Sequence, residues 1–260
     1  MGEASLIGID CGSTLCKGAL LKKAPGTFSH NGAGIGAFSV LPTGWDLPES
    51  ASRVLAELTG TPPKMAVIAT GYGRGAVREK TKAVTEISAH ARGAEYLMAG
   101  VRTVIDIGGQ DCKVIAVENG KVTGFQMNDK CAAGTGRFVQ IIMERFGADI
   151  ALLDSLLASC LSIRLNSTCA VFAESEIIGL LAKGKSREEI AGGVAQSLAV
   201  KISSLAARVG VREPVVLTGG LAESAGIREA LSQVLGIEVQ FLPNGLYAGA
   251  IGAACMGLDL

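Results

Sequence analysis

The chain has 260 residues, enough to bury a substantial core in one large domain or two small ones. A hydrophobic fraction of 48% with 35 glycines and few aromatic residues is typical of an α/β protein with many tight turns, and it excludes disorder. The 24 lysines and arginines balance the 24 aspartates and glutamates, and no basic run is present, which excludes a nucleic acid as the expected partner.

The sequence predicts neither a leader nor a membrane segment. The N-terminus lacks a basic segment followed by an apolar core, and the most apolar late stretch, residues 246–258, is too short to span a bilayer. The seven cysteines show neither CxxC nor disulfide-framework spacing, so thiols or metal ligands are expected. We therefore expect a cytoplasmic protein that binds no membrane.

The first predicted element is a β-hairpin at residues 5–21, SLIGIDCGSTLCKGALL. An apolar strand leads into a Gly-Ser-Thr turn, and a second strand begins near Cys16. A helix is then predicted at residues 48–58, a buried strand at 64–71, and a second helix at 85–97.

A second hairpin is predicted at residues 102–127, where an Asn-Gly turn leads into a third strand. It aligns with the first hairpin without gaps at an offset of 96 residues, the spacing from Asp10 to Asp106. An internal duplication is the simplest explanation. The matched pairs are Asp10 with Asp106, Gly12 with Gly108, Cys16 with Cys112, and Lys17 with Lys113.

The remaining chain is more helical. Apolar spacing predicts helices at residues 134–146, 170–181, 188–209 and 226–235, and strands at 214–220 and 237–242. The predicted fold is α/β, with duplicated βββαβα halves at residues 1–100 and 101–260. The chain termini are left free to pack back on the first half.

Both hairpins carry an aspartate at a strand end, followed by glycine and small polar residues. Such a turn offers backbone N–H groups to phosphate and a carboxylate to hydrated Mg2+. We predict that Asp10, Asp106 and Gln110 contact Mg2+-bound water or orient the attacking water. The predicted phosphate contacts are Gly12, Ser13, Thr14, Lys17, Gly108, Gly109 and Gln110.

A third glycine turn, LTGGLAES, follows the predicted strand at residues 214–220, where Gly219 and Gly220 would lie beside a nucleoside. Taken alone, the DxGST motif fits a capped hairpin turn equally well. Two such hairpins followed by a strand and a Gly-Gly turn resemble the phosphate and adenosine motifs of the actin and hexokinase superfamily, whose nucleotide lies between two similar domains. This resemblance implies that the chain binds ATP and ADP.

Two cysteines precede predicted helices, Cys131 in NDKCAAGTGRF and Cys169 in NSTCAVFAESE. Free N–H groups and the helix dipole at such positions favour a thiolate. The alternatives are two small buried residues or a pair of metal ligands. A 4Fe-4S cluster needs four thiolates, and two subunits related by a two-fold axis would supply them.

The motifs GIDCGST, ATGYGR, VIDIGGQDCKVI, MNDKCAAGTGRF, STCAVFAESE and LTGGLAES resemble the activator component of 2-hydroxyacyl-CoA dehydratases. That family is shared with the ATPase subunits of benzoyl-CoA reductase, and the resemblance runs nearly end to end. It implies a homodimer with one 4Fe-4S cluster, to which each subunit contributes the cysteines matching Cys131 and Cys169. It also implies MgATP hydrolysis coupled to one-electron transfer.

By the same resemblance, the electron comes from a ferredoxin or flavodoxin and goes to an iron–sulfur dehydratase or related CoA-thioester reductase. The small residues Gly134, Thr135 and Gly136 would let a helix start touch both the cluster and the nucleotide, coupling the two. The glycine-rich residues 24–40 depart from the family pattern, which leaves the partner's identity open.

Some features have structural explanations or remain open. His90 is expected to be structural, and the roles of Arg74, Glu174 and Glu176 are open. The alternative function is a small-molecule kinase, for sugars or acyl groups, of the same superfamily, although little sequence is left for an acceptor-binding insertion. A third class, an actin-type filament subunit, would need no cysteine pair.

Overall fold

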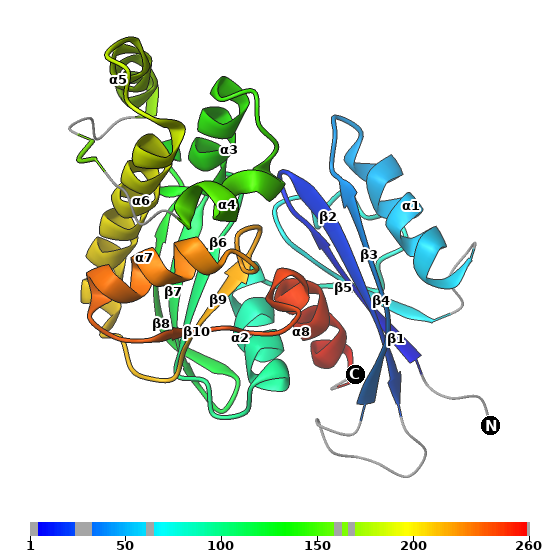
Figure 1. The fold of residues 1–260 in the computed structure, drawn as a ribbon. Helices are drawn as coiled ribbons and strands as arrows, with labels where there is room; N and C mark the ends of the chain where they lie inside the picture. The colour runs from blue at the N-terminus through cyan, green and yellow to red at the C-terminus, as the bar shows by residue number, and fades with distance from the viewer. Residues whose placement is uncertain (1–4, 24–32, 61–64, 159–162, 166–169, 259–260) are drawn as a thin grey trace.

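The computed structural model describes residues 5–23, 33–60, 65–158, 163–165 and 170–258. These residues form two five-stranded sheets that stand side by side with helices around and between them (Figure 1). The predicted α/β fold with duplicated halves is therefore confirmed.

The first sheet has the strand order β3-β2-β1-β4-β5. Strand β2 runs antiparallel to β1 and β3, whereas β4 runs parallel to β1 and β5. Helix α1, Leu47–Thr59, packs on this sheet through Val54 and Leu55, and Asp46 caps its start. The strands are β1 Ser5–Cys11, β2 Leu15–Lys23, β3 Ala33–Pro42, β4 Ala66–Thr70 and β5 Lys82–Ala83.

The second sheet repeats this arrangement, with the order β10-β9-β6-β7-β8. Strand β6 pairs antiparallel with β7 and parallel with β9, as β1 does with β2 and β4. Asp106 faces Lys113 across β6 and β7, in the register that joins Asp10 to Lys17. The strands are β6 Thr103–Ile107, β7 Cys112–Glu118, β8 Lys121–Asn128, β9 Val215–Gly219 and β10 Val239–Gln240.

The helices of the second half cover its sheet and extend above it (Figure 1). Phe138, Ile142 and Leu198 are among the buried side chains that join α3 and α6 to the sheet. The helices are α3 Gly136–Arg145, α4 Leu153–Leu157, α5 Ala170–Ala182, α6 Arg187–Val209 and α7 Ala225–Leu235, with short 3-10 turns η1 Ala132–Gly134, η2 Ile150–Leu152 and η3 Gly245–Tyr247.

Helix α6 is the one helix in the described ranges that is long and apolar enough to cross a membrane by length and composition. Half of its most apolar window is buried within the fold, and a core helix of a globular protein passes the same test. A reciprocal capping box of Ser186 and Glu189 starts this helix.

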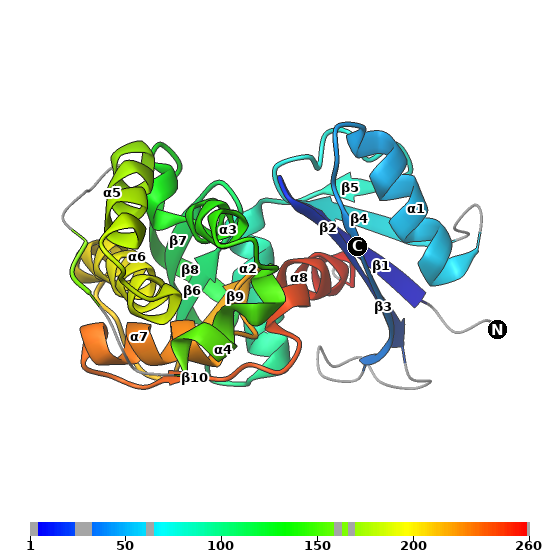
Figure 2. The same cartoon turned by 45° about the horizontal axis from the view of Figure 1, so that its top comes forward.

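Two helices lie between the sheets, α2 Glu86–Leu97 and α8 Ala248–Gly257 (Figure 2). Helix α2 follows the first sheet in the chain but packs on the second, and α8 packs on the first. The two helices meet at backbone distance, because a Cβ on Gly252 would lie 1.8 Å from Ala89 O. The predicted division of the chain near residue 100 remains a prediction.

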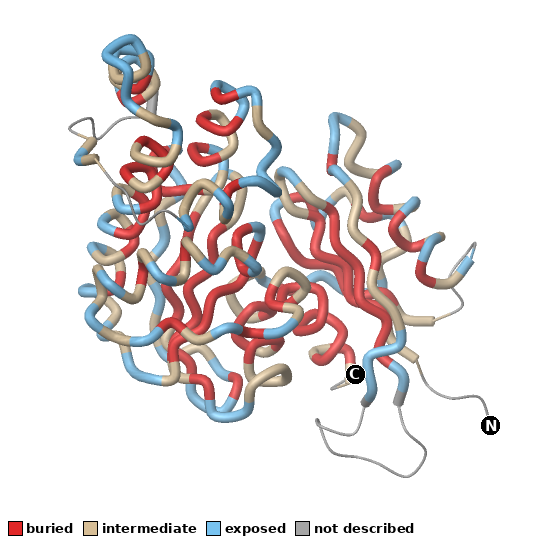
Figure 3. The backbone as a smooth tube through the Cα atoms, in the orientation of Figure 1, coloured by how far each residue is buried: buried red, intermediate tan, exposed pale blue. Residues whose placement is uncertain are grey.

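Burial follows these layers, and Figure 3 shows that buried backbone runs through the strands of both sheets and through α8. The sequence had indicated most elements, but it did not indicate a helix at α8 or a strand at β3. Helix α3 begins at Gly136 and not at residue 134, since the 3-10 turn η1 comes first.

Candidate functional site

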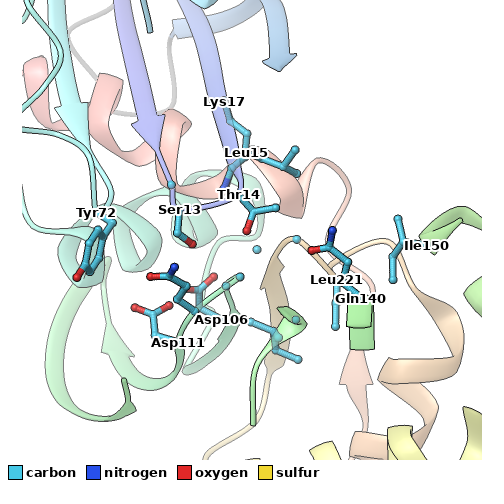
Figure 4. Close-up of a pocket in the computed structure, with 18 of the residues that line it drawn as sticks. Ser13, Thr14, Leu15, Lys17, Tyr72, Asp106, Asp111, Gln140, Ile150 and Leu221 are labelled. Carbon is cyan, nitrogen blue, oxygen red and sulfur yellow. The ribbon is translucent and has the colours of Figure 1, made fainter. Parts of the chain in front are cut away.

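A cavity of about 530 Å3 lies between the two sheets, at the ends of the two duplicated hairpins. Figure 4 shows Ser13 and Thr14 on one side, Asp106 and Asp111 facing them, and Gln140, Ile150 and Leu221 toward the other end. The predicted site residues that line it are Asp10, Gly12, Ser13, Thr14, Lys17, Asp106, Gly108, Gly109, Gln110, Gly136, Gly219 and Gly220. The volume is in the range of small-molecule sites.

The first hairpin turn is held by backbone bonds. Gly12 N donates to Leu15 O at 3.1 Å, and the Thr43 hydroxyl donates to Gly12 O at 2.8 Å. These bonds leave the side chains of Ser13 and Thr14 directed into the cavity (Figure 4). The turn therefore presents two hydroxyl groups to a ligand.

Beneath this turn, Lys17 Nζ donates to Asp10 Oδ2 at 2.7 Å, and both side chains are buried. Burial alone would lower the pKa of Lys17, but the ion pair with Asp10 and the nearby charges of Asp106 and Glu86 raise it. The other carboxylate oxygen, Asp10 Oδ1, is buried and has no hydrogen-bond partner in the described part of the chain. Asp10 therefore keeps one acceptor for a ligand.

The matching lysine of the second hairpin is more heavily engaged. Lys113 Nζ lies 3.1 Å from Asp106 Oδ2, 3.0 Å from Glu86 Oε1 and 2.9 Å from Asp111 Oδ1. Burial opposes the charged form of this lysine, but the three carboxylates raise its pKa well above the usual range. Lys113 thus acts as the central cation of a buried acidic cluster.

The second oxygen of Asp106 is also occupied. Thr218 Oγ1 donates to Asp106 Oδ1 at 3.2 Å, and His90 Nδ1 lies 3.3 Å from the same oxygen. Burial would raise the pKa of Asp106, but the electrostatic interactions with His90, Lys113 and Lys17 hold it well below its usual range. Unlike Asp10, Asp106 has donors on both oxygens.

Glu86, His90 and Asp106 place ligand-type atoms within 4.8 Å of one another, as a metal site would. The ammonium group of Lys113 lies 3.0 Å from Glu86 and 3.1 Å from Asp106, so it already supplies the positive charge there. Burial, together with the charges of Asp106 and Asp10, raises the pKa of Glu86 despite the opposing charges of Lys113 and His90. The cluster therefore fits an internal ion network better than a metal ion.

Glycines let other atoms approach the backbone closely both at the ends of the parallel strands and between the two hairpin turns. Gly71 and Gly219 end the parallel strands β4 and β9 with φ of +88° and +91°. A Cβ would lie 2.4 Å from Asp10 Oδ1 at Gly71 and 2.6 Å from Asp106 Oδ1 at Gly219. Across the cavity, a Cβ on Gly109 would lie 2.0 Å from Thr14 Oγ1, so the two hairpin turns touch.

The start of α3 is joined to the second hairpin turn. Gly136 N donates to Gly108 O at 2.8 Å, and Arg137 N donates to Gly109 O at 3.1 Å. Gly134 and Thr135 do not line the cavity, and their predicted contact with a nucleotide stays a prediction. Gly136 lets the helix start approach the turn, because a Cβ there would lie 3.0 Å from Gly108 O.

Cys131 lies just ahead of η1, where Asn128 holds its backbone. Asn128 Nδ2 donates to Cys131 O at 2.8 Å, and Cys131 N donates to Asn128 Oδ1 at 3.2 Å. Cys131 is partly exposed, and the other cysteines in the described part of the chain are buried. Cys169 lies outside the described residues.

Other residues at the site were not predicted as such from the sequence. Tyr72, Glu86, His90, Gln140, Glu144 and Ile150 also line the cavity. A signal was available for two of them, because Glu86 and His90 are four residues apart and share one face of α2. Arg74 donates to Gly71 O at 3.0 Å, and Glu174 of α5 pairs with Arg145 of α3.

Comparison with known proteins extends these findings. A sequence model described as the BadF/BadG/BcrA/BcrD ATPase family matches residues 7–257. The chain is 44% identical over 253 residues to the (R)-2-hydroxyglutaryl-CoA dehydratase activating ATPase of Acidaminococcus fermentans, with 95% of each chain covered.

Two solved structures are similar over nearly their whole length. The (R)-2-hydroxyglutaryl-CoA dehydratase component A of Acidaminococcus fermentans gives a TM-score of 0.88 at 41% identity, covering 98% of each chain. The activator of the 2-hydroxyisocaproyl-CoA dehydratase from Clostridium difficile with bound ADPNP gives 0.89 at 39% identity, covering 98% of this chain and 94% of that one.

Proposed function

The chain belongs to the BadF/BadG/BcrA/BcrD ATPase family, and from this premise we propose that it is an ATP-dependent one-electron donor that activates a partner 2-hydroxyacyl-CoA dehydratase or related CoA-thioester reductase. The observation that carries the proposal is the end-to-end similarity to dehydratase activators, at 44% identity over 253 residues. The actin- and hexokinase-like fold provides the ATPase cleft, and a similar activator binds ADPNP.

In this proposal the nucleotide phosphates lie between the two hairpin turns. Ser13 and Thr14 offer hydroxyl groups, and Gly108, Gly109 and Gln110 line the facing side. The nucleoside extends toward Gly219 and Gly220. The two hairpin turns and Gly219 and Gly220 line one and the same cavity, which supports this orientation.

The two aspartates have different proposed roles. Asp10 Oδ1 is an unpaired acceptor, so Asp10 would contact Mg2+-bound water or orient the attacking water, and Gln110 lines the same cavity. Asp106 has donors on both oxygens, which favours a supporting role over direct contact with Mg2+-bound water. The two aspartates, which the sequence pattern treats alike, are therefore proposed to differ in role.

The proposed ligands of a 4Fe-4S cluster are Cys131 and Cys169 from each of two subunits. Cys131 fits this role because it is partly exposed and its side chain caps no helix. Helix α5 begins at Ala170, the residue after Cys169 in the chain. When bound, such a cluster supplies one-electron transfer to the partner.

Exposed apolar side chains on the second half support a homodimer. Phe172 and Ile178 of α5 are 68% and 51% exposed, and α5 projects from the body of the molecule (Figure 1). Phe125 and Met127 are exposed on β8, the strand that leads to Cys131. Apolar surface on both sides of a proposed ligand is what a subunit interface would cover.

A short path joins the proposed phosphate site to Cys131. Gly108 and Gly109 accept hydrogen bonds from the first N–H groups of α3, and η1 connects α3 to Cys131. Movement of the second hairpin turn on ATP hydrolysis would therefore be passed to the cysteine segment. A ferredoxin or flavodoxin is the proposed electron source.

The test compares two cysteine variants purified without oxygen. Cys131→Ser should lose its iron and acid-labile sulfide and keep ADPNP binding, because Cys131 lies outside the cavity lining. Cys112→Ala is the matched control. It lies near the same Asn128 but is buried, and burial and the charges of Asp106 and Asp111 raise the pKa of its thiol to about 12, so it should keep its iron. A full iron content in Cys131→Ser would contradict the ligand assignment.

A further inference from the structure

His90 stands between the two hairpins. It lies on α2, is 1% exposed, and lines the cavity beside both aspartates. A lone histidine with apolar neighbours is more often structural, but this one has two polar partners on Nδ1 and lies at the cavity. Its surroundings therefore indicate a role in the site.

One side of the ring is fixed by the second half. His90 Nδ1 lies 2.9 Å from Thr218 Oγ1 and 3.3 Å from Asp106 Oδ1. Because the Thr218 hydroxyl donates to Asp106, its oxygen is left to accept from the ring, so Nδ1 carries a proton. The orientation of the ring is thereby set by β6 and β9.

The other side faces the first half across a glycine. A Cβ built on Gly249 of α8 would lie 2.8 Å from His90 Nε2 and 2.9 Å from Asp10 Oδ2. Both atoms thus border the same small space, which only a glycine leaves open. Nε2 therefore lies on the side of the ring toward Asp10, whose other oxygen, Oδ1, has no partner among the described residues.

We propose that His90 is a positioning residue for ATP hydrolysis, in which Asp106 and Thr218 hold Nδ1, and Nε2 aligns the Asp10 carboxylate with the terminal phosphate through one water. The inference rests on the proposed role of Asp10 at the phosphate.

This arrangement links the two halves of the molecule. Asp10 belongs to the first sheet, whereas Asp106 and Thr218 belong to the second. Glu86 and the two lysines, Lys17 and Lys113, complete the charged groups that face the ring. Alignment of Asp10 then depends on the relative placement of the two sheets, so the rate of hydrolysis should depend on that placement as well.

Two amide variants separate the two ring nitrogens. In His90→Asn the amide N–H can replace Nδ1 but nothing replaces Nε2, whereas in His90→Gln the longer amide reaches the Nε2 position. We expect kcat for ATP hydrolysis to fall by about tenfold to a hundredfold in His90→Asn and by less in His90→Gln. The Kd for ADPNP should stay within about twofold, because no phosphate contact is lost.

A purely structural role for His90 predicts the reverse order, since His90→Asn keeps the bond to Thr218. Wild-type kcat in His90→Asn, or a greater loss in His90→Gln, would overturn the proposal. Wild-type protein is measured first, because a wild type without ATPase activity would contradict the proposed function itself.

A second variant leaves His90 in place. Gly249→Ala puts a methyl group 2.8 Å from Nε2 and 2.9 Å from Asp10 Oδ2, so these side chains must shift; it should lower kcat at least tenfold and also lower the melting temperature. Gly124→Ala on β8 is the control, because a Cβ there meets nothing within 4 Å. A folded Gly249→Ala protein with wild-type kcat would overturn the proposal even if both His90 variants failed to fold.

Discussion

The two halves of the molecule carry the same aspartate–lysine pair in the same strand register, but in different surroundings. In the first half, the Asp10 side chain hydrogen-bonds only with Lys17 among the residues that the structure describes, and one of its oxygens has no partner there. In the second, Asp106 meets Lys113, Thr218 and His90, and Lys113 meets two further carboxylates. The Asp10–Lys17 pair therefore has an oxygen left for a ligand, whereas both oxygens of Asp106 are engaged within the protein.

The strand ends show the same contrast. Thr70 of β4 and Thr218 of β9 pair with Asp10 and Asp106 in the strand register, and each precedes a glycine with positive φ. Thr218 donates to Asp106, but Thr70 donates to Val84 O at 3.3 Å, away from Asp10. The same backbone geometry therefore accompanies a hydrogen-bonded network around Asp106 in the second half and an unpaired oxygen of Asp10 in the first.

The largest expected effect comes from removing the central lysine. Lys113→Met leaves three carboxylates without their shared cation, and loss of one partner from a buried ion pair costs about 3–5 kcal/mol of unfolding free energy. Lys17→Met leaves only Asp10 unpaired and should cost less. Urea unfolding of both nucleotide-free variants measures the difference, and equal losses would contradict the contrast between the halves.

The next effect separates activity from stability. Asp10→Asn should lower kcat for ATP hydrolysis by about a hundredfold, since a carboxylate with a free oxygen is lost from the site, while the fold is kept. Asp106→Asn weakens two internal hydrogen bonds and the contact with His90, and should lose more stability than Asp10→Asn. If Asp106→Asn were the more stable of the two, the supporting role of Asp106 would be wrong.

A smaller effect tests the two threonines. Thr218→Val removes the donor to Asp106 and the partner of His90, and should cost about 1–3 kcal/mol of unfolding free energy. Thr70→Val is the equivalent change in the first half, and loses one long hydrogen bond to a backbone carbonyl. We expect its cost to be about 1 kcal/mol or less. Thermal unfolding of the pair provides the measurement, and a reversed order would count against the account.

The smallest expected effect is on how the unfolding free energy decreases as the pH is lowered from neutral to acid. Because the pKa of Asp106 in the folded state lies well below its usual range, its contribution to stability is present above the unfolded pKa of about 3.9 and is lost as the pH falls through the folded value. Asp106→Asn should therefore lose less stability than wild type on going from neutral to acid pH. An unchanged decrease would show that other carboxylates dominate it.

Much of this fold is visible in the sequence because the two hairpins repeat their polar residues at one spacing. The Asn119-Gly120 turn marks its strands equally clearly, and both residues have positive φ. Helix α8 was not predicted, because its glycines disfavour a helix locally. They are required only by the contact with α2, where Gly93 and Gly252 approach the facing backbone.

The site was partly predictable for the same reason. Duplication indicated both aspartates and the glycine turns, but a sequence pattern assigns the same role to each copy. The difference between Asp10 and Asp106 arises from residues that are distant in sequence, His90 and Thr218. Only the packing of α2 against the second sheet brings His90 to Asp106.

The most direct measurement for the proposed function is the iron and acid-labile sulfide content per chain of anaerobically purified protein, taken together with its mass in solution. The account predicts one 4Fe-4S cluster per dimer, or about two irons per chain, held by Cys131 and Cys169 of both subunits. A colourless monomer that takes up no iron on anaerobic reconstitution would contradict it.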